Sequence, residues 1–362
     1  MAGLDSKRVT LDDVAQAVGV SSQTVSRVVN GHPYVSDETR RRVQDAIRKL
    51  GYRPNRAARS LATQRTCMLG IVTFGIDHYG PAQMVTHVEQ TARARGYGVT
   101  LSTVRVLTPH EIRVAIDALG GSAVDGLVLI TPVTGLSGAD MTALCANIPF
   151  VQIDTELGAK VPSVVIDQRF GSRLATQYLI DLGHRALCEI SGPLNWYGAR
   201  ARHESWVKTL RQAGLAPGPS VEGDWTAASG FCAANRLLDE GAVFSGLVVG
   251  NDQMALGAIR ALRGRGLRVP EDVSVVGFDD IPEAAYFEPP LTTVWQNFAA
   301  LGEQSVEYLV ALIDNPHTPV HQRVLHPQLV ERQSACPPRQ GAFSLEGETS
   351  PPRRRARREK TD

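Results

Sequence analysis

The sequence lacks the features that mark secreted, membrane and metal-binding proteins. No uninterrupted apolar stretch approaches the ~20 residues of a membrane span, and the N-terminal segment has no apolar signal-peptide core. Cysteines are few, odd in number and without C-x-x-C spacing, which argues against a disulfide framework or a zinc site; they stand at positions 67, 145, 188, 232 and 336. We therefore expect reduced thiols in a cytoplasmic protein with no membrane partner.

Signatures of catalysis are missing as well. There is no Gly-x-Ser-x-Gly elbow, no P-loop and no His-Glu-x-x-His, and Gly75 and Gly80 are too loosely placed for a dinucleotide fingerprint. The nine histidines do not cluster as metal ligands would, and His184 stands just before a strand, where a structural role is favoured. The sequence predicts neither an enzyme nor a cofactor or metal site.

Charge is unevenly distributed along the chain. The 362 residues carry a formal net charge of only +1, whereas residues 1–65 hold twelve Lys or Arg against six Asp or Glu. Positive charge gathered in one segment is typical of a module that binds nucleic-acid phosphates. The length suggests two or three domains, and the 43% apolar content is that of a soluble globular protein.

The segment from Thr10 to Asn30 has the pattern of two short helices. Apolar residues recur at helical spacing until Gly19, and Ser21 or Ser22 then caps a second apolar stripe. A break of a few residues is typical of a helix-turn-helix. The second helix exposes side chains that can hydrogen-bond to base edges in a major groove; they are Ser22, Gln23, Ser26 and Arg27. By itself this pattern leaves an ordinary packed helix pair open.

A third helix is predicted over Val35–Leu50, with Ser36 as its cap. Its apolar stripe consists of Val43, Ala46, Ile47 and Leu50. A short piece after it has helical character from Asn55 onward.

Residues 66–336 alternate β-branched apolar runs with helical segments. This alternation predicts doubly wound parallel sheets with helices on both faces; the runs are 69–73, 98–102, 126–130, 150–153, 187–190, 246–249 and 273–276. Ligands bind at the carboxyl ends of such strands. Asp154, Asn251 and Asp279 follow three of these runs, so the sequence predicts a ligand cleft there.

The motifs together resemble the LacI/GalR family of bacterial transcription repressors. The resemblance runs from about Thr10 to Gln333 and rests on Val9–Ala15, Val20–Asn30, Tyr52–Leu61, Gly183–Arg185, Ile190–Leu194, Ala199–Arg202, Gly223–Trp225, Asn251–Ala258, Ser274–Asp280 and Pro289–Thr293. It implies a helix-turn-helix head over 1–54, a hinge and linker over 55–66, and a two-lobed core over 67–336, similar to periplasmic sugar-binding proteins. Lobe one would span about 67–166 and 296–325, and lobe two about 167–295 and 326–336.

The same resemblance implies a homodimer on palindromic operator DNA. We expect Ser22, Gln23 and Arg27 to read bases, and the segment Asn55–Ala62 to fold on DNA and press Leu61 into the minor groove. The full predicted DNA-binding set is Thr10, Leu11, Ser21, Ser22, Gln23, Thr24, Ser26, Arg27, Asn30, His32, Tyr52, Asn55, Ala58 and Leu61.

A small sugar, a galactoside or another β-glycoside disaccharide, is the expected effector. Paired hydroxyls suit a carboxylate or a guanidinium, and an indole face suits a pyranose ring. Residues at positions that bind inducer in a family member are Asp154, Arg202, Trp225, Asn251 and Asp279, with Gln296 and Phe298 as less specific matches. Trp196, Phe74 and Tyr79 depart from that member; Trp196 either stacks on the ligand or fills a loop. Taken singly, each residue could instead be a strand-end cap or a structural ion pair.

Two further readings stay open at this point. Asp154 and Asp279 could form a glycosidase-like acid/base pair, although a DNA-binding head argues against it. The ligand could be an inducer that releases DNA, or a non-sugar co-repressor as in another branch of the family. Residues 337–362 are rich in Pro, Gly and Arg without a leucine heptad, which predicts a disordered basic tail and assembly that stops at the dimer.

Overall fold

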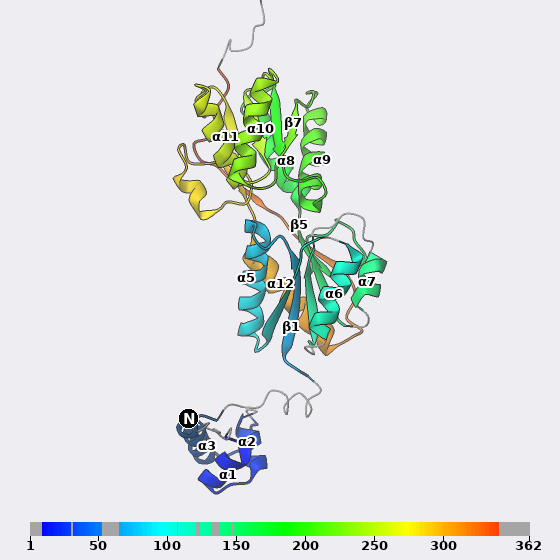
Figure 1. The fold of residues 1–362 in the computed structure, drawn as a ribbon, viewed down its shortest axis with the longest axis vertical. Helices are drawn as coiled ribbons and strands as arrows, with labels where there is room; N and C mark the ends of the chain where they lie inside the picture. The colour runs from blue at the N-terminus through cyan, green and yellow to red at the C-terminus, as the bar shows by residue number, and fades with distance from the viewer. Residues whose placement is uncertain are drawn as a thin grey trace, which may run out of the picture. The chain divides into compact units, whose positions relative to one another are not determined.

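The computed structural model describes residues 9–29, 32–52, 65–106, 108–120, 124–131, 138–145 and 148–339. They fall into two compact units, an N-terminal head that extends to Met68 and an α/β core (Figure 1). In the described part of the chain, no helix combines the length and apolarity needed to cross a membrane. The predicted hinge at 55–62 and the basic tail from 340 lie outside the described residues.

Three helices build the head: α1 (Leu11–Val18), α2 (Ser22–Val29) and α3 (Asp37–Leu50). Thr10 and Asp13 form a capping box at the start of α1, and Gly19 ends that helix in the left-handed region at φ 70°. The Ser21 hydroxyl accepts a hydrogen bond from the Thr24 backbone N–H at 3.2 Å. Ser21 is thus the cap of α2.

Apolar side chains from the three helices share one small core. Val14, Val25 and Val43 are fully buried there. The predicted third helix is corrected in two respects. It begins at Asp37 and not Val35, because Ser36 caps it through the Thr39 N–H, and its last residue Leu50 is 38% exposed and does not continue the buried stripe.

Lobe one of the core is a six-stranded sheet with the order β11-β5-β4-β3-β1-β2. Its strands are β1 (Met68–Phe74), β2 (Gly98–Val104), β3 (Gly126–Ile130), β4 (Phe150–Ile153), β5 (Ser163–Ile166) and β11 (Gln322–Leu325). The register pairs of β1, β3, β4, β5 and β11 are all parallel. Helices α5 (Tyr79–Ala94) and α12 (Phe298–Asp314) cover one face of the sheet, and α6 (Pro109–Gly120) and α7 (Gly138–Cys145) the other (Figure 1).

Lobe two holds a parallel sheet with the order β7-β6-β8-β9. Its strands are β6 (Leu187–Ser191), β7 (Ser220–Glu222), β8 (Gly246–Val249) and β9 (Ser274–Val276). Helices α8 (Gln168–Asp181) and α9 (Tyr197–Gln212) pack together, as do α10 (Ala227–Asp239) and α11 (Asp252–Gly264). The short helix η1 (Pro282–Tyr286) and an antiparallel pair, β10 (Thr293–Trp295) with β12 (Gln328–Val330), complete it.

The predicted fold class is confirmed: a helix-turn-helix head joined to an α/β core of parallel sheets. All seven predicted strands are present. Five further strands of three or four residues, β5, β7, β10, β11 and β12, were not predicted. The chain passes between the two lobes three times, after β5, after β10 and after β11. The lobes therefore share three connecting segments, and polar strand ends from both face the space between them.

Candidate functional site

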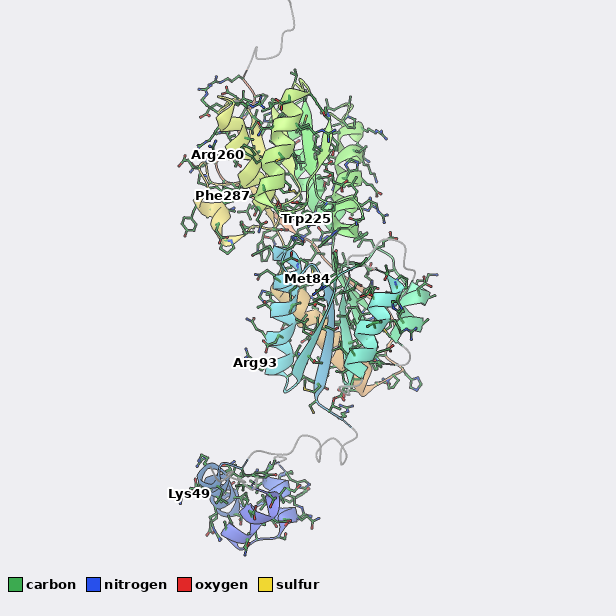
Figure 2. All side chains as sticks on the ribbon, in the orientation of Figure 1. Lys49, Met84, Arg93, Trp225, Arg260 and Phe287 are labelled. Carbon is green, nitrogen blue, oxygen red and sulfur yellow. The ribbon has the colours of Figure 1, made fainter. Side chains whose placement is uncertain are left out.

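A cavity of about 500 Å³, counting the part open to solvent, lies where the two lobes meet. In Figure 2 Trp225 of lobe two and Met84 of α5 mark this level of the molecule. Both lobes supply its lining: His78, Gly80, Pro81, Met84, Asp154, Gln168, Trp196, Gly198, Ala199, Arg202, Trp225, Asp279 and Gln296.

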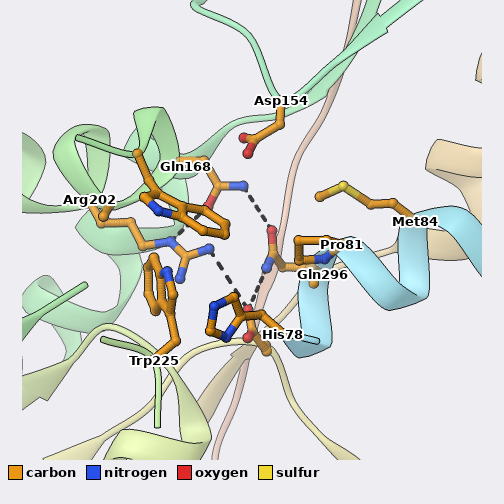
Figure 3. A pocket seen from close by; sticks show the side chains of 13 residues that line it. His78, Pro81, Met84, Asp154, Gln168, Arg202, Trp225 and Gln296 are labelled. Atoms are coloured by element: carbon orange, nitrogen blue, oxygen red, sulfur yellow. Dashed lines mark hydrogen bonds and ion pairs between the residues drawn. The ribbon is translucent and has the colours of Figure 1, made fainter. Parts of the chain in front are cut away.

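Three buried polar side chains, Gln168, Asp279 and Gln296, form a closed ring at the cavity with the partly buried Arg202 (Figure 3). Arg202 Nε donates to Gln168 Oε1 at 2.8 Å, and Gln168 Nε2 donates to Gln296 Oε1 at 2.9 Å. Gln296 Nε2 donates in turn to Asp279 Oδ1 at 2.6 Å, and the ring closes where Arg202 approaches the same oxygen at 3.8 Å. Because Gln296 lies on a segment between the lobes, the ring ties lobe two to a crossing of the chain.

The Arg202 guanidinium is held from several sides. Besides its two partners in the ring, it donates to the Gly250 carbonyl and lies over the Phe278 ring at 3.7 Å. Burial lowers the pKa of Arg202, while Asp279 and Asp154 act in the opposite direction. The guanidinium is thus a buried cation whose charge is balanced inside the site.

Two carboxyl groups face this cation. Burial raises the pKa of Asp154 and that of Asp279 to about 6 each, and the Arg202 charge opposes both shifts. Both residues adopt left-handed backbone conformations, at φ 59° and 106°. Such conformations cost free energy in a non-glycine residue and concentrate at functional sites, so these strand ends are candidates for ligand contacts.

Two indole rings wall the cavity on the lobe-two side. The rings of Trp196 and Trp225 lie 5.8 Å apart at 70°, edge to face. Trp225 packs so closely on Gly192 that a Cβ there would come within 2.1 Å of the ring. The indole Nε1 of Trp225 is buried and has no hydrogen-bond partner in the described structure. Trp225 therefore offers a flat face together with an unused donor.

Trp196 reaches from lobe two to the loop that joins β1 to α5 in lobe one. Its ring lies 5.2 Å from the Phe74 ring and 5.5 Å from the His78 ring. A Cβ at Gly75 would come within 2.5 Å of the indole, so a glycine is required at this contact. Trp196 thus lines the cavity and packs on the loop between β1 and α5, and its stacking on a ligand stays a prediction.

Six of the ten predicted effector residues line the cavity: Asp154, Trp196, Arg202, Trp225, Asp279 and Gln296. Phe74, Tyr79 and Phe298 lie behind the lining. Phe74 contacts Trp196, and Tyr79 packs edge-on against Phe298 at 6.1 Å. Tyr79 also packs on the apolar cores of both lobes, and burial, aided by nearby Asp279, raises its pKa to about 12. For these three the structure favours a supporting position over a ligand contact.

Asn251 does not belong to the cavity lining. Its Oδ1 caps α11 by accepting from the Met254 N–H at 2.9 Å. Its Nδ2 donates to the Trp225 carbonyl at 3.0 Å and to Gln253 Oε1 at 2.9 Å. Both amide hydrogens are thus engaged and hold the backbone of Trp225 in place, and the role of Asn251 as an effector contact stays a prediction.

Sequence reasoning missed several lining residues, of which Gln168 matters most. It lies directly after β5, and Asp167 caps the helix that it begins. Because ligands bind at the carboxyl ends of parallel strands, Gln168 would have been predicted if the four-residue strand β5 had been recognised. His78, Pro81 and Met84 line the opposite wall from the start of α5, and no sequence motif marks them.

In the head, the predicted base-reading residues differ in exposure. Gln23 and Arg27 are exposed on α2, whereas Ser22 is half-buried and its hydroxyl donates to Asp12 of α1. Thr24 is half-buried and its hydroxyl bonds with that of Ser21 at 2.9 Å. Gln23 and Arg27 are thus the accessible side chains of this face.

The remaining head residues take varied positions. Thr10 caps α1, Leu11 packs on the core, Ser26 is half-buried and His32 is exposed. Tyr52 is only 8% exposed and belongs to the core of the head, so its ring has a structural role, and its contact with DNA stays a prediction. Asn30, Asn55, Ala58 and Leu61 lie outside the described residues.

Comparisons with known proteins agree along the whole chain. Residues 10–55 match the family of bacterial regulatory proteins called lacI, and residues 176–335 match a periplasmic binding protein-like domain. The lactose operon repressor of Escherichia coli is 37% identical over 332 residues, or 92% of each chain. A repressor of Haemophilus influenzae named PurR is 35% identical over 330 residues, 90% of this chain and 98% of the relative.

Solved structures give the same result. The Lac repressor dimer bound to operator and the anti-inducer ONPF matches with a TM-score of 0.84 at 37% identity, covering 91% of this chain and all of that one. The complex of the regulator CelR with cellobiose matches with a TM-score of 0.66 at 34% identity, again over 91% of this chain and all of that one.

Proposed function

The chain belongs to the LacI family of bacterial regulatory proteins and is a DNA-binding repressor, and from this premise we propose that it is induced by a sugar. A homodimer in the bacterial cytoplasm binds a palindromic operator, and a small sugar in the cavity lowers that affinity. The relatives described above are named as repressors or regulators, not enzymes. Asp154 and Asp279 therefore act as ligand-binding groups and not as an acid/base pair.

The exposed side chains of α2 support base reading by the head. Gln23 and Arg27 can each form paired hydrogen bonds with a purine edge in the major groove. Thr24, Ser26, Asn30 and His32 position phosphates, and Leu61 of the hinge enters the minor groove as an apolar wedge. One such head buries too little surface for strong specificity, so two must act together.

An exposed apolar group on lobe two supports the homodimer. Phe231 of α10 and Leu256 of α11 are 41% and 45% exposed, and Tyr286 of η1 is 88% exposed. The helices that carry the first two pack closely, because a Cβ at Gly257 of α11 would lie 2.6 Å from the Phe231 backbone nitrogen of α10. Exposed apolar groups of this kind mark protein interfaces. The relative solved with operator is itself described as a dimer.

One observation carries the choice of a sugar: the ring of Arg202, Gln168, Gln296 and Asp279 beside the indole of Trp225, whose Nε1 has no partner in the described structure. Carboxylate, amide and guanidinium groups at this spacing suit the alternating hydroxyls of a pyranose, and Trp225 suits its apolar face. A planar purine is best held between two parallel rings, whereas the two indoles meet at 70°. The angle between the two indole rings argues against a purine co-repressor, which is the alternative suggested by the similarity to PurR.

The test is fluorescence anisotropy of a labelled palindromic fragment from the region upstream of this gene, at fixed salt. Galactosides, cellobiose, simple hexoses and purine bases are titrated into the complex. We expect release of the DNA by one sugar. Tight DNA binding that a purine strengthens, and no sugar weakens, would overturn induction and establish a co-repressor.

A further inference from the structure

The chain enters lobe one through a turn that a single carboxylate holds in place. Asp125 Oδ1 accepts hydrogen bonds from the Thr66 backbone N–H and from the Thr66 hydroxyl, both at 2.8 Å. Its Oδ2 accepts from the Cys67 N–H at 2.8 Å, and its own backbone N–H donates to the Met68 carbonyl at 2.8 Å. Three successive residues at the junction of the predicted linker with the core are thus bonded to one aspartate.

These contacts give the turn one defined path. A carboxylate that accepts from backbone N–H groups forms charge-assisted hydrogen bonds, which are shorter and stronger than those between neutral groups. The Thr66 hydroxyl also accepts from the Met68 N–H at 3.2 Å. Cys67 between them adopts a left-handed conformation at φ 52°. Such a conformation costs free energy in a non-glycine residue, so it persists only where the surrounding contacts impose it.

Asp125 is itself firmly mounted on lobe one. It stands directly before β3, which pairs with β1 on one side and with β4 on the other. The next residue, Gly126, packs so closely on α12 that a Cβ there would come within 2.9 Å of Leu309 Cδ1. The position of Asp125 is therefore fixed by the centre of the sheet, and the turn that it holds is fixed with it.

A fixed turn at this place has a consequence for DNA binding, because one stretch of chain connects the head to the core. If the end of that stretch could swivel freely, each head of a dimer would sample many positions, and the separation of the heads would depend little on the core. A joint that fixes the direction of the chain restricts each head to fewer positions. The effective concentration of the second head then rises at one half-site spacing and falls at others.

We propose that Asp125 is a specificity-determining residue for operator spacing. By holding Thr66 and Cys67 on lobe one, it sets which separation of half-sites the two heads of a dimer can span. This inference rests on the proposed function, since it requires a homodimer on a palindrome, but it does not depend on the effector. Asp125 acts through the path of the chain and makes no contact with bases.

The experiment measures how strongly the full-length protein distinguishes operator spacings. Fluorescence anisotropy gives its affinity for the palindromic fragment, for the same fragment with base pairs inserted one at a time at its centre, and for a single half-site. The unaltered protein should lose affinity with each insertion. Asp125→Ala should bind the palindrome about tenfold more weakly, because a swivelling joint lowers the effective concentration of the second head, and should lose less affinity on insertion. Its binding to the single half-site should be unaltered, which verifies that the head is folded.

Matched variants separate the joint from general damage to the protein. Thr66→Val keeps the shape of the side chain and removes the hydroxyl that bonds to Asp125, so it should reproduce part of the effect. Thr66→Ser keeps the hydroxyl and should distinguish spacings as the unaltered protein does. Asp117→Ala removes an exposed carboxylate from α6 and is the control for the change in net charge.

The outcomes distinguish this inference from the proposed function. An Asp125→Ala protein that distinguishes spacings as strongly as the unaltered protein would overturn the inference and leave Asp125 as the cap of a turn. Equal losses on the palindrome and on the half-site would overturn it too, since the head itself would then be impaired. An unaltered protein that binds the palindrome no better than one half-site would overturn the proposed homodimer together with the inference. Failure of every sugar to release the DNA, by contrast, would overturn induction alone.

Discussion

At the scale of single residues, Asp279 belongs to the ring that joins lobe two to the crossing segment, and we propose that it couples the ligand to that ring. It accepts from Gln296 and pairs with Arg202. Asp279→Asn should keep operator binding and abolish release by the sugar, since the amide can no longer serve as a charged acceptor for sugar hydroxyls. Losing one hydrogen bond to a charged group costs about 1.5–3 kcal/mol, or roughly ten- to a hundredfold in sugar affinity. Fluorescence anisotropy with operator DNA measures operator binding and its release by the sugar, and Asp117→Asn is the control. A normal sugar response in Asp279→Asn would contradict the assignment of Asp279 to the effector site.

The two raised pKa values make a second prediction, on pH. Asp154 and Asp279 have pKa values of about 6 in the folded chain, against 3.8 for an unperturbed aspartate. The folded protein thus binds more protons than the unfolded chain between about pH 4 and 6, and these groups make folding less favourable as pH rises through that window. A sugar donating to the carboxylates favours their ionised form.

Sugar affinity should therefore fall as the pH is lowered from 8 through 6. Calorimetric titrations at half-unit steps measure it, and the decline should be shallower in Asp154→Asn. A neutral sugar that binds equally well at pH 5 and pH 8 would show that neither carboxylate accepts from it.

At the scale of elements, α2 carries the prediction for DNA. Arg27 is exposed in the last turn of this eight-residue helix, whose opposite face is buried through Val25 and Val28. Arg27→Ala should relax base preference at one symmetric position of the operator, at a cost of about 1–3 kcal/mol per contact. Binding constants for operators altered one base pair at a time measure this. Arg93→Ala on α5 removes a charge outside the head and is the control; uniform weakening across all operators would assign Arg27 to phosphates.

The elements also show how far the sequence could predict the site. Long buried strands such as Gly126–Ile130 carry a clear pattern. Asp154 and Asp279 follow strands of only four and three residues, whose apolar sequence runs were recognised. β5 is as short as β4, but it begins with the polar residue Ser163, so it was not recognised and Gln168 was missed with it.

Asn251 shows a second limit of prediction from sequence. Its type suits both a ligand contact and a helix cap, and only the observed bonds to Met254 and to the Trp225 carbonyl decide between the two. The aromatic packing of Trp196 on Gly75 depends on residues 121 positions apart, which no local pattern reveals.

At the scale of the whole molecule, the effector response depends on two copies acting together. A dimer brings two heads to two half-sites, and the effective concentration of the second head raises operator affinity far above that of one head alone. A ligand changes that affinity only if it binds one arrangement of the lobes better than another, and a hundredfold preference corresponds to about 2.7 kcal/mol. Loss of the dimer should therefore weaken operator binding without affecting the cavity.

Leu256→Arg tests this separation. A charge placed in the exposed apolar group on α10 and α11 should yield monomers in sedimentation at micromolar concentration, because burying an unpaired cation in an interface is costly. Binding to the palindrome should then fall to the level of a single half-site, while sugar binding measured by calorimetry stays unaltered. Val243→Arg is the matched control, since Val243 is 50% exposed and follows the C-terminal end of α10. A Leu256→Arg protein that remains dimeric would place the homodimer interface on another face of the core.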